Sequence, residues 1–427
     1  MNSKRNETPQ RPARRDFLKA GGAAVSAGAL GASAIQARDA AAAVPESKSI
    51  EPFYGEHQGG IVTPQQSHAY VAALDLTTGK REDLIALLKT WTDIAARLTR
   101  GEPAAPLKGP DDKPAADSGE ALGLGTANLT LTFGFGPGMF TQDGKDRYGL
   151  AKHRPPQLVD LPRFNGDQLL PAKTGGDLFI QGCADDPQVV FHAVHQLARA
   201  AYGRAQMRWG QAGFLSAPKG ETPRNLMGFK DGTSNPPAHD AAQMKKFVWA
   251  NEESPAWMRG GTYTVVRRIR ITLEHWDRME RGFQESVIGR HKYSGAPLGG
   301  KHEMDPIDLD AADKDGNSVI PDNSHVRLSN QAMNNGAQIL RRAYSYNDGT
   351  DFYIERWPPW RQETEYDAGL IFIAHQSDPR TGFIPINDRL SKFDMMNQFT
   401  THVGSAIFAC PPGAKPGSYI GAELFEA

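Results

Sequence analysis

Two spacings of apolar side chains alternate along the first half of this chain. Residues 68–76 predict a strand, and in residues 128–135 Leu, Leu, Phe and Phe recur at every second position, as in a strand with one buried face. Between them, residues 81–98 repeat apolar side chains every three or four positions, which predicts an amphipathic helix. Residues 101–119 are rich in Pro, Asp, Lys and Ala and predict a surface insertion.

The same half closes with a second helix between two further strands. Residues 177–184 and residues near 206–214 predict these strands. Asp186 is suited to cap the helix between them, and Pro187 is suited to its first position because proline lacks an N–H that this position would leave unpaired. The resulting β-α-β-β-α-β order is the ferredoxin-like one.

The second half repeats this plan around a long insertion. A strand at 262–273 is followed by a helical segment from about Asp277 and then by about 80 residues of insertion, a length that indicates function. The chain then returns to a strand at 370–375, a helix at 387–399 and a strand at 404–410. We therefore expect an α+β fold of two ferredoxin-like halves, duplicated as in a dimeric α+β barrel, with inserted segments walling a cavity in the C-terminal half.

The first 43 residues predict an export signal rather than a folded element. Arg14 and Arg15 precede a weakly apolar run rich in Ala and Gly, as in signals of the twin-arginine route. An uncleaved membrane anchor is the alternative, but the run is too short and too rich in small residues to favour it. We expect the folded protein to be periplasmic or otherwise exported.

Composition and charge narrow the classes of partner. The 427 residues are 39% apolar, enough for one large core or two, and a net charge of −1 gives no electrostatic reason to expect a nucleic acid as partner. The only cysteines, Cys183 and Cys410, lie in apolar runs typical of strands, so we expect two buried thiols and no disulfide framework. Neither belongs to a Cys-x-x-Cys-His sequence, so a haem here would be held without thioether bonds to cysteine.

Candidate functional side chains are most concentrated in residues 225–236, Asn-Leu-Met-Gly-Phe-Lys-Asp-Gly-Thr-Ser-Asn-Pro. The two glycines permit positive φ and close approach to a flat ligand, and Thr233 and Ser234 can donate hydrogen bonds to carboxylates. Asp231 would then be the ionisable side chain turned toward a reacting atom. Asp-Gly followed by Asn-Pro is also ordinary turn chemistry, and the local residues alone do not decide between the two interpretations.

Residues 228–236 resemble the signature loop of the dye-decolourising peroxidases, in the exported deferrochelatase/peroxidase (EfeB) branch. Other segments resemble that family in the same order along nearly the whole chain: Pro52-Phe53-Tyr54-Gly55, Phe135 to Phe140, Gly295 to Gly299, Ser324 to Leu328 and Leu340 to Tyr346. The resemblance implies the duplicated ferredoxin-like fold, peroxidase activity and one non-covalently held haem b per chain.

The resemblance also assigns roles in the chemistry. It implies that His325 is the proximal ligand of the haem iron, because residues 324–328 match the family's proximal segment. Peroxide activation needs a base, an acid and a cation. Asp231 is expected to serve as base and acid, and Arg341 as the permanently charged cation. Adjacent Arg342 is the alternative to Arg341, and Ala343 stands where the family usually has glycine.

Further contacts are implied at the edge of the haem. The expected cofactor-binding residues are Gly232, Thr233, Ser234, Lys292, Asn330, Gln331, Ala332 and Arg341, with Arg290 as an alternative to Lys292. Asp394 is a candidate acceptor for the proximal imidazole N–H, or else a helix-surface aspartate. His192 and His195 are three positions apart on a predicted helix and could form a metal-binding pair, but no third ligand occurs at a matching spacing.

The predicted function is a haem b peroxidase that reduces hydrogen peroxide and oxidises an organic reductant, bulky and phenolic, dye-like or porphyrin, with a place in iron acquisition from haem. The alternative is an exported haem-binding and iron-delivery protein, a deferrochelatase, with incidental peroxidase activity. Such a carrier needs only His325 and a pocket. The resemblance is also compatible with two kinds of partner. These are components of an iron-uptake system and further copies of the same chain in a homo-oligomer. The expected division is a signal at 1–43, an N-terminal half at 44–224 and a C-terminal half with the haem site at 225–427.

Overall fold

The structure, a computed structural model, describes residues 50–218, 220–354 and 362–426, and the predicted signal at 1–43 lies outside them. The helices are α1 (Arg81–Leu98), α2 (Pro137–Phe140), α3 (Pro187–Ala200), α4 (Ala241–Phe247), α5 (Leu273–Trp276), α6 (Arg281–Ile288), α7 (His325–Ser329), α8 (Phe383–Phe393) and α9 (Ala422–Glu426). The strands are β1 (His68–Leu76), β2 (Thr130–Phe135), β3 (Thr141–Gln142), β4 (Lys145–Asp146), β5 (Leu178–Ala184), β6 (Ala205–Phe214), β7 (Thr262–Ile271), β8 (Leu340–Arg341), β9 (Tyr344–Ile354), β10 (Gln362–Gln376) and β11 (Thr400–Cys410). Among the described residues, none of the helices combines the length and apolar character that crossing a bilayer requires.

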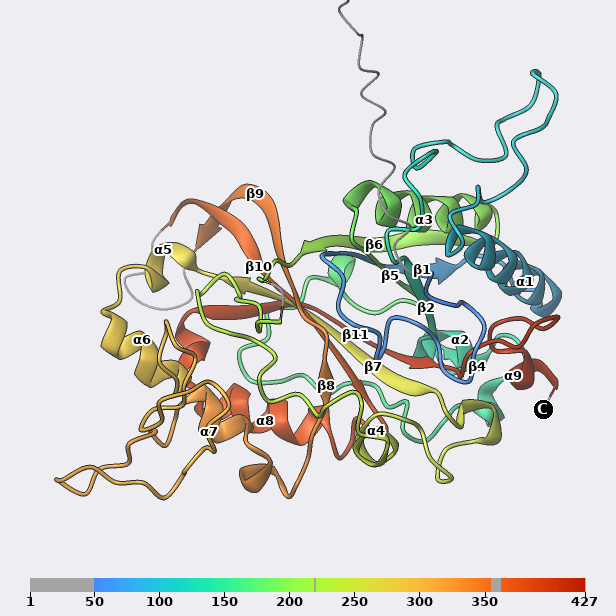
Figure 1. Cartoon of the computed structure of the whole chain (residues 1–427). Helices are drawn as coiled ribbons and strands as arrows, with labels where there is room; N and C mark the ends of the chain where they lie inside the picture. The colour runs from blue at the N-terminus through green and yellow to red at the C-terminus, as the bar shows by residue number, and fades with distance from the viewer. Residues whose placement is uncertain (1–49, 219, 355–361, 427) are drawn as a thin grey trace, which may run out of the picture. The chain divides into compact units, whose positions relative to one another are not determined.

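The N-terminal half is an antiparallel sheet in the order β2-β5-β1-β6, covered on its outer face by α1 and α3 (Figure 1). α1 has the predicted bounds because its apolar stripe is buried, and Trp91 on that stripe donates its indole N–H to Leu197 O at 2.8 Å. Asp186 caps α3 by accepting the N–H groups of the first turn, and Pro187 stands in that turn. The predicted ferredoxin-like connectivity is therefore present.

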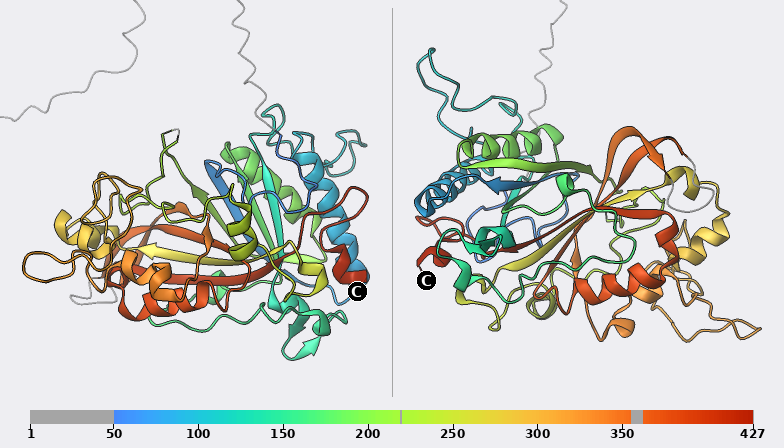
Figure 2. Two further views of the ribbon diagram at one scale, coloured as in Figure 1. Left: turned by 60° about the horizontal axis from the view of Figure 1, so that its bottom comes forward. Right: turned by 180° about the vertical axis from the view of Figure 1, so that it is seen from behind.

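The C-terminal half has the equivalent order β11-β7-β10-β9. Its first crossover is the long segment from α5 to β8, and α8 provides the second. Helices α7 and α8 lie on the other side of the strands from α1 and α3 (Figures 1 and 2). The long crossover is the predicted insertion, and it supplies part of the site described below.

Three elements of this half differ from the predictions. The strand predicted to reach residue 273 ends at Ile271, because Leu273 already begins α5. The strand β9 was not predicted, and its hairpin with β10 makes β10 longer than the expected 370–375. The helix predicted at 387–399 is α8 followed by a short 3-10 turn, because Asp394 has an extended backbone (φ −74°, ψ 126°) and ends the helix.

The two sheets close on each other into a barrel-like arrangement. Single pairings, Ala409 with Phe135 and Phe214 with Ser345, join their edges. The inner faces share a core in which Phe179 and Phe408, one from each half, stack with ring centroids 4.5 Å apart. Both cysteines are free and buried in this core, as predicted.

Candidate active site

A cavity of about 640 Å³ opens on the outer face of the C-terminal sheet. Strands β7, β10 and β11 contribute to it, together with α7, α8 and the loop 225–236. Its apolar lining includes Ile269, Ile271, Leu370, Phe372, Phe383 and Ile386. The volume lies within the range of about 300–1,000 Å³ that is usual for ligand pockets.

The loop 225–236 is anchored so that one carboxylate turns into this cavity. The side-chain oxygen of Asn225 accepts the N–H of Phe229 at 3.3 Å, and the Phe229 ring is buried. Gly232 has a φ of +120°, a backbone conformation that favours glycine. Asp231, between Phe229 and this turn, lines the cavity.

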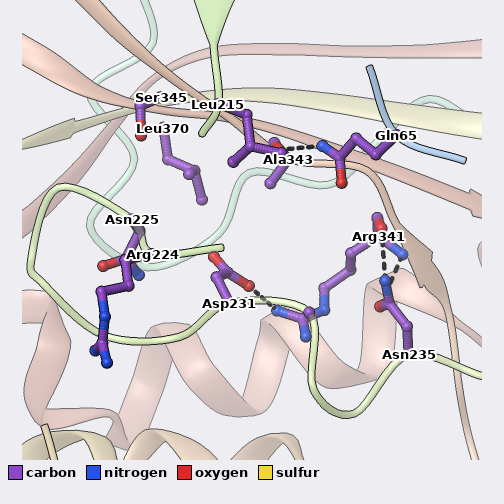
Figure 3. Close-up of a pocket in the computed structure, with 11 residues that line it drawn as sticks. Gln65, Leu215, Arg224, Asn225, Asp231, Asn235, Arg341, Ala343, Ser345 and Leu370 are labelled. Atoms are coloured by element: carbon purple, nitrogen blue, oxygen red, sulfur yellow. Dashed lines mark hydrogen bonds and ion pairs between the residues drawn. The ribbon is translucent and has the colours of Figure 1, made fainter. Parts of the chain in front are cut away.

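An ion pair joins Asp231 to Arg341, which lies 110 positions further along the chain (Figure 3). Arg341 Nη1 donates to Asp231 Oδ1 at 2.7 Å. Asn235 clamps the arginine backbone, because its Nδ2 donates to Arg341 O at 2.7 Å and its Oδ1 accepts the Arg341 N–H at 3.1 Å. A cleft of about 20 Å³ adjoins the pair and is lined also by Gln65 and Ser345.

Arg342 points elsewhere. Its Nη1 donates to Thr63 O at 2.6 Å, its guanidinium also bonds the side chain of Gln66, and the residue is 4% exposed. It is not among the residues that line the cavity. Successive residues of an extended chain point to opposite sides, so one arginine of this pair faces the cavity and the other faces the barrel.

The same cavity receives His325 from α7. His325 Nδ1 lies 2.6 Å from Oδ2 of Asp394, whose side chain is 3% exposed. Burial lowers the pKa of His325, but the charge and hydrogen bond of Asp394 raise it by more, so the net pKa is raised. Because the carboxylate accepts the Nδ1 proton, Nε2 is the nitrogen left to bind a metal.

Comparison with known proteins identifies the family. The N-terminal model of Dyp-type peroxidases matches residues 58–215, and the C-terminal model matches residues 222–415. The chain belongs to the Dyp-type peroxidase family. It is a haem-dependent peroxidase, and the family predicted from the sequence is confirmed.

Relatives of this Dyp-type peroxidase cover most of its length. The dye-decolorizing peroxidase of Thermobifida fusca is 39% identical over 386 residues, which are 86% of this chain and 84% of that one. The deferrochelatase of Escherichia coli strain K12 is 36% identical over 429 residues and 97% of both chains. The crystal structure of a DyP-type peroxidase from Streptomyces coelicolor is 39% identical, with a TM-score of 0.80 over 90% of this chain and 99% of that chain. The predicted α+β fold is thereby confirmed.

Most of the other predicted haem contacts of this Dyp-type peroxidase lie at the cavity. Those that line it are Gly232, Thr233, Ser234, Asn330 and Gln331. Ala332 is exposed and does not line it. Lys292 also points away, because its ammonium donates to Gln284 Oε1 at 2.7 Å, whereas Arg290 of the same segment lines the cavity.

A charged group beneath the cavity of this Dyp-type peroxidase was not singled out from the sequence. Arg267 in β7 is fully buried, its Nε donates to His402 Nδ1 at 3.0 Å, and its guanidinium pairs with Asp167. Burial, and then the charge of Arg267, lower the pKa of His402 well below its usual value, so this cavity-lining imidazole is neutral. The sequence does place an arginine inside an apolar strand. Because a fully buried charge nearly always has a partner, this pattern could have indicated a buried ion pair.

Replacing Asp394 with asparagine in this Dyp-type peroxidase is expected to lower peroxide-dependent turnover about 10- to 100-fold and to raise the midpoint potential of the bound haem. The reason is that an amide in place of the carboxylate would leave the His325 imidazole a weaker electron donor. Turnover with a dye and a redox titration are the measurements. Asp388→Asn is the control, because Asp388 pairs with Lys392 on the exposed side of α8. Unchanged turnover and an unchanged midpoint potential would show that Asp394 has no role at the site.

Proposed function

We propose that this Dyp-type peroxidase holds haem b in the cavity through His325 and activates hydrogen peroxide with Asp231 and Arg341. The supporting observation is that one cavity of about 640 Å³ contains both a carboxylate-oriented imidazole and the Asp231–Arg341 ion pair. A protein that only carried haem would need the imidazole but not the ion pair.

The residues present fit a haem group. The Nδ1 of His325 is already bonded to Asp394, so Nε2 is the atom that would hold the haem iron. Apolar side chains from β7, β10 and α8 offer contact to a macrocycle, and Arg290 and Thr233 are donors suited to propionates. Both cysteines lie in the barrel core rather than at the cavity, which agrees with non-covalent binding.

Proton transfer and charge stabilisation fall to the residues of the ion pair. Haem, when bound, supplies an iron centre that exchanges electrons with peroxide and with the organic reductant. Asp231 accepts a proton from hydrogen peroxide and returns it to the oxygen that departs as water. Arg341 stabilises the negative charge that develops on that oxygen. The small cleft beside them has room for about one water-sized molecule next to Asp231, and the large cavity that the same residue lines has room for hydrogen peroxide (Figure 3).

Rapid mixing of the haem-loaded protein with hydrogen peroxide tests this proposal. We expect the Soret band to change at a rate proportional to the peroxide concentration, followed by oxidation of a bulky phenol or dye. Haem-loaded protein whose spectrum does not respond to peroxide would contradict it.

Removal of iron from haem is a second candidate function. It is favoured by the similarity to the K12 deferrochelatase, which spans 97% of this chain. Incubation with haem would then yield iron-free porphyrin, which is detected by its fluorescence. Peroxide consumption without any such fluorescence would exclude this function and leave the peroxidase proposal intact.

We also propose export by the twin-arginine route, to the periplasm. The 97% coverage against the K12 deferrochelatase extends into the first 49 residues, where Arg14 and Arg15 lie. Replacing both arginines with lysine is expected to retain the protein in the cytoplasm, and undiminished export in cell fractionation would contradict the route. Three further expectations from the sequence remain predictions. They are the division of the chain at residue 224, partners in iron uptake, and assembly into a homo-oligomer.

A further inference from the structure

A buried ion pair fixes the orientation of one histidine in the large cavity. His402 in β11 lines the cavity, and its Nδ1 accepts a hydrogen bond of 3.0 Å from Arg267 Nε. Arg267 is fully buried and is held in turn by Asp167. Because a guanidinium only donates hydrogen bonds, Nδ1 carries no proton, and the proton of this neutral imidazole is on Nε2. His402 therefore offers one N–H donor and has no free lone pair with which to take a proton.

This donor has no partner in the part of the chain that the structure describes. Nδ1 is the only side-chain atom of His402 that forms a hydrogen bond with any described residue. The side-chain amide of Asn387, on α8, bonds to none of these residues either, although Asn387 is only 7% exposed and lines the cavity. Buried polar groups are nearly always hydrogen-bonded, so a bound molecule is expected to satisfy both side chains.

His402 and Asn387 lie at the same end of the cavity, because one segment of the N-terminal half contacts the surroundings of both. The N–H of Gln168 donates to His402 O at 3.0 Å. Asn165, three positions earlier, donates from Nδ2 to Ser391 O at 3.1 Å, and Ser391 is one turn of α8 after Asn387. The strand and the helix therefore present the two unpartnered side chains to the same part of the cavity.

This end of the cavity is remote from the Asp231–Arg341 pair. Leu370, Ile269 and His402 are directly paired neighbours across β10, β7 and β11, and all three line the cavity. Leu370 also lines the small cleft beside the ion pair. Neighbouring strands are about 4.8 Å apart, so His402 lies about 10 Å beyond Leu370. A molecule held by His402 therefore leaves the ion pair free for peroxide.

The same end adjoins a hollow in the surface. Residues 163–168 line this hollow, which has a volume of about 440 Å³. Four of them, residues 164–167, also line the large cavity. The end of the cavity near His402 therefore lies next to the surface, where a bulky molecule can approach.

We propose that His402 and Asn387 bind the hydroxyl group of a phenolic reductant at this end of the cavity. The inference rests on the proposed peroxidase function and adds to it a site for the second substrate. A phenolic oxygen accepts the hydrogen bond from His402 Nε2, and the phenolic O–H donates to the side-chain oxygen of Asn387. Because both side chains are neutral, the site favours a hydroxyl over an anion, whose buried charge would have no counterion. Arg267 acts on the phenol only by positioning His402.

Calorimetric titration of the haem-loaded full chain with the phenol syringol, without peroxide, tests this site. We expect saturable binding by the wild type. His402→Asn keeps an oxygen that accepts the bond from Arg267 but has no atom at the position of Nε2. Its Kd for syringol should therefore be about 3- to 10-fold higher, as for one lost hydrogen bond, and Asn387→Leu should have a similar effect. His402→Gln, which can place an N–H near the lost one, should bind syringol more tightly than His402→Asn does.

Turnover separates the loss of phenol binding from general damage to the protein. The KM for syringol should rise by the same factor in His402→Asn, whereas the KM for tetramethyl-p-phenylenediamine, an aromatic reductant without oxygen, should change less. His195→Asn is the matched control. His195 Nδ1 also lies close to a charged side chain, 2.7 Å from Glu120 Oε1, but on the N-terminal half and outside the cavity. This control should match the wild type with both reductants.

The rate of haem transfer to apomyoglobin distinguishes a phenol from a haem propionate as the partner of His402. We expect His402→Asn to release haem at close to the wild-type rate. Faster release with unchanged syringol binding would assign the N–H to a propionate and overturn the proposal. Wild-type protein without saturable syringol binding, or equal binding by the folded His402→Asn variant, also overturns it. Protein that binds syringol as expected but does not react with peroxide would contradict the proposed function and leave this site in place.

Discussion

Replacing Asp231 with asparagine is expected to slow the reaction of the haem-loaded protein with hydrogen peroxide about 10²- to 10⁴-fold. Asparagine has nearly the same shape as aspartate and keeps an oxygen to accept the hydrogen bond from Arg341, which is 2.7 Å long in the wild type. An amide, however, does not take a proton from peroxide. Stopped-flow absorbance of the Soret band at several peroxide concentrations gives the second-order rate constant.

The exposed ion pair between Asp75 and Arg208 provides the control for this variant. Arg208 Nη1 lies 2.9 Å from Asp75 Oδ2 on the N-terminal half, so Asp75→Asn makes the same chemical change away from the cavity. It should react with peroxide at the wild-type rate. If Asp231→Asn, with haem bound, also kept the wild-type rate constant, proton transfer would have to be assigned to Arg341 and solvent instead.

Replacing Arg341 with leucine is expected to lower the same rate constant about 10²- to 10³-fold, because it removes the fixed positive charge beside the departing oxygen. Arg341→Lys should recover part of the loss, since it keeps the charge but not the planar fork of donors. The effects of Asp231→Asn and Arg341→Leu should not multiply in the double variant, because residues that act as one unit are not additive.

Arg208→Leu is the corresponding control, because it breaks an arginine–carboxylate pair of similar exposure outside the cavity. Full activity in Arg341→Leu would contradict the role of the guanidinium. Equal losses in Arg341→Leu and Arg208→Leu would indicate a general loss of stability. A thermal melt of each haem-loaded variant separates these outcomes.

Helices and strands of the two halves were predictable from the sequence where apolar side chains recur at one regular spacing. The helix at Arg81–Leu98 has the predicted ends because its apolar stripe is continuous and buried. The strand Tyr344–Ile354 was missed because only its first three residues are buried, while most of the rest face solvent in a hairpin with β10. A strand without a buried face carries little periodic signal.

The helix end at Asp394 shows what local pattern cannot supply. The apolar spacing continues past this residue, so the sequence predicted a helix to 399. In the fold, the Asp394 carboxylate accepts both the Met396 N–H and the His325 Nδ1 proton, and the extended backbone that allows this ends the helix. The contact with His325 joins residues 69 positions apart, so the local apolar pattern gave no sign of it.

Side-chain direction was the other quantity that the sequence did not determine. Arg290 and Lys292 lie two positions apart in one irregular segment, and the predicted Lys292 faces α6 while Arg290 lines the cavity. The resemblance singled out Asp231, His325 and Arg341, and the structure places all three at one cavity. Their roles stay predictions.

The crystal structure of the haem-loaded protein tests the central claim most directly. We predict that the iron is coordinated by Nε2 of His325, with Asp231 and Arg341 on the other face of the macrocycle. A haem bound outside this cavity, iron coordinated by another residue, or Asp231 and Arg341 on the same face as His325 would contradict the account.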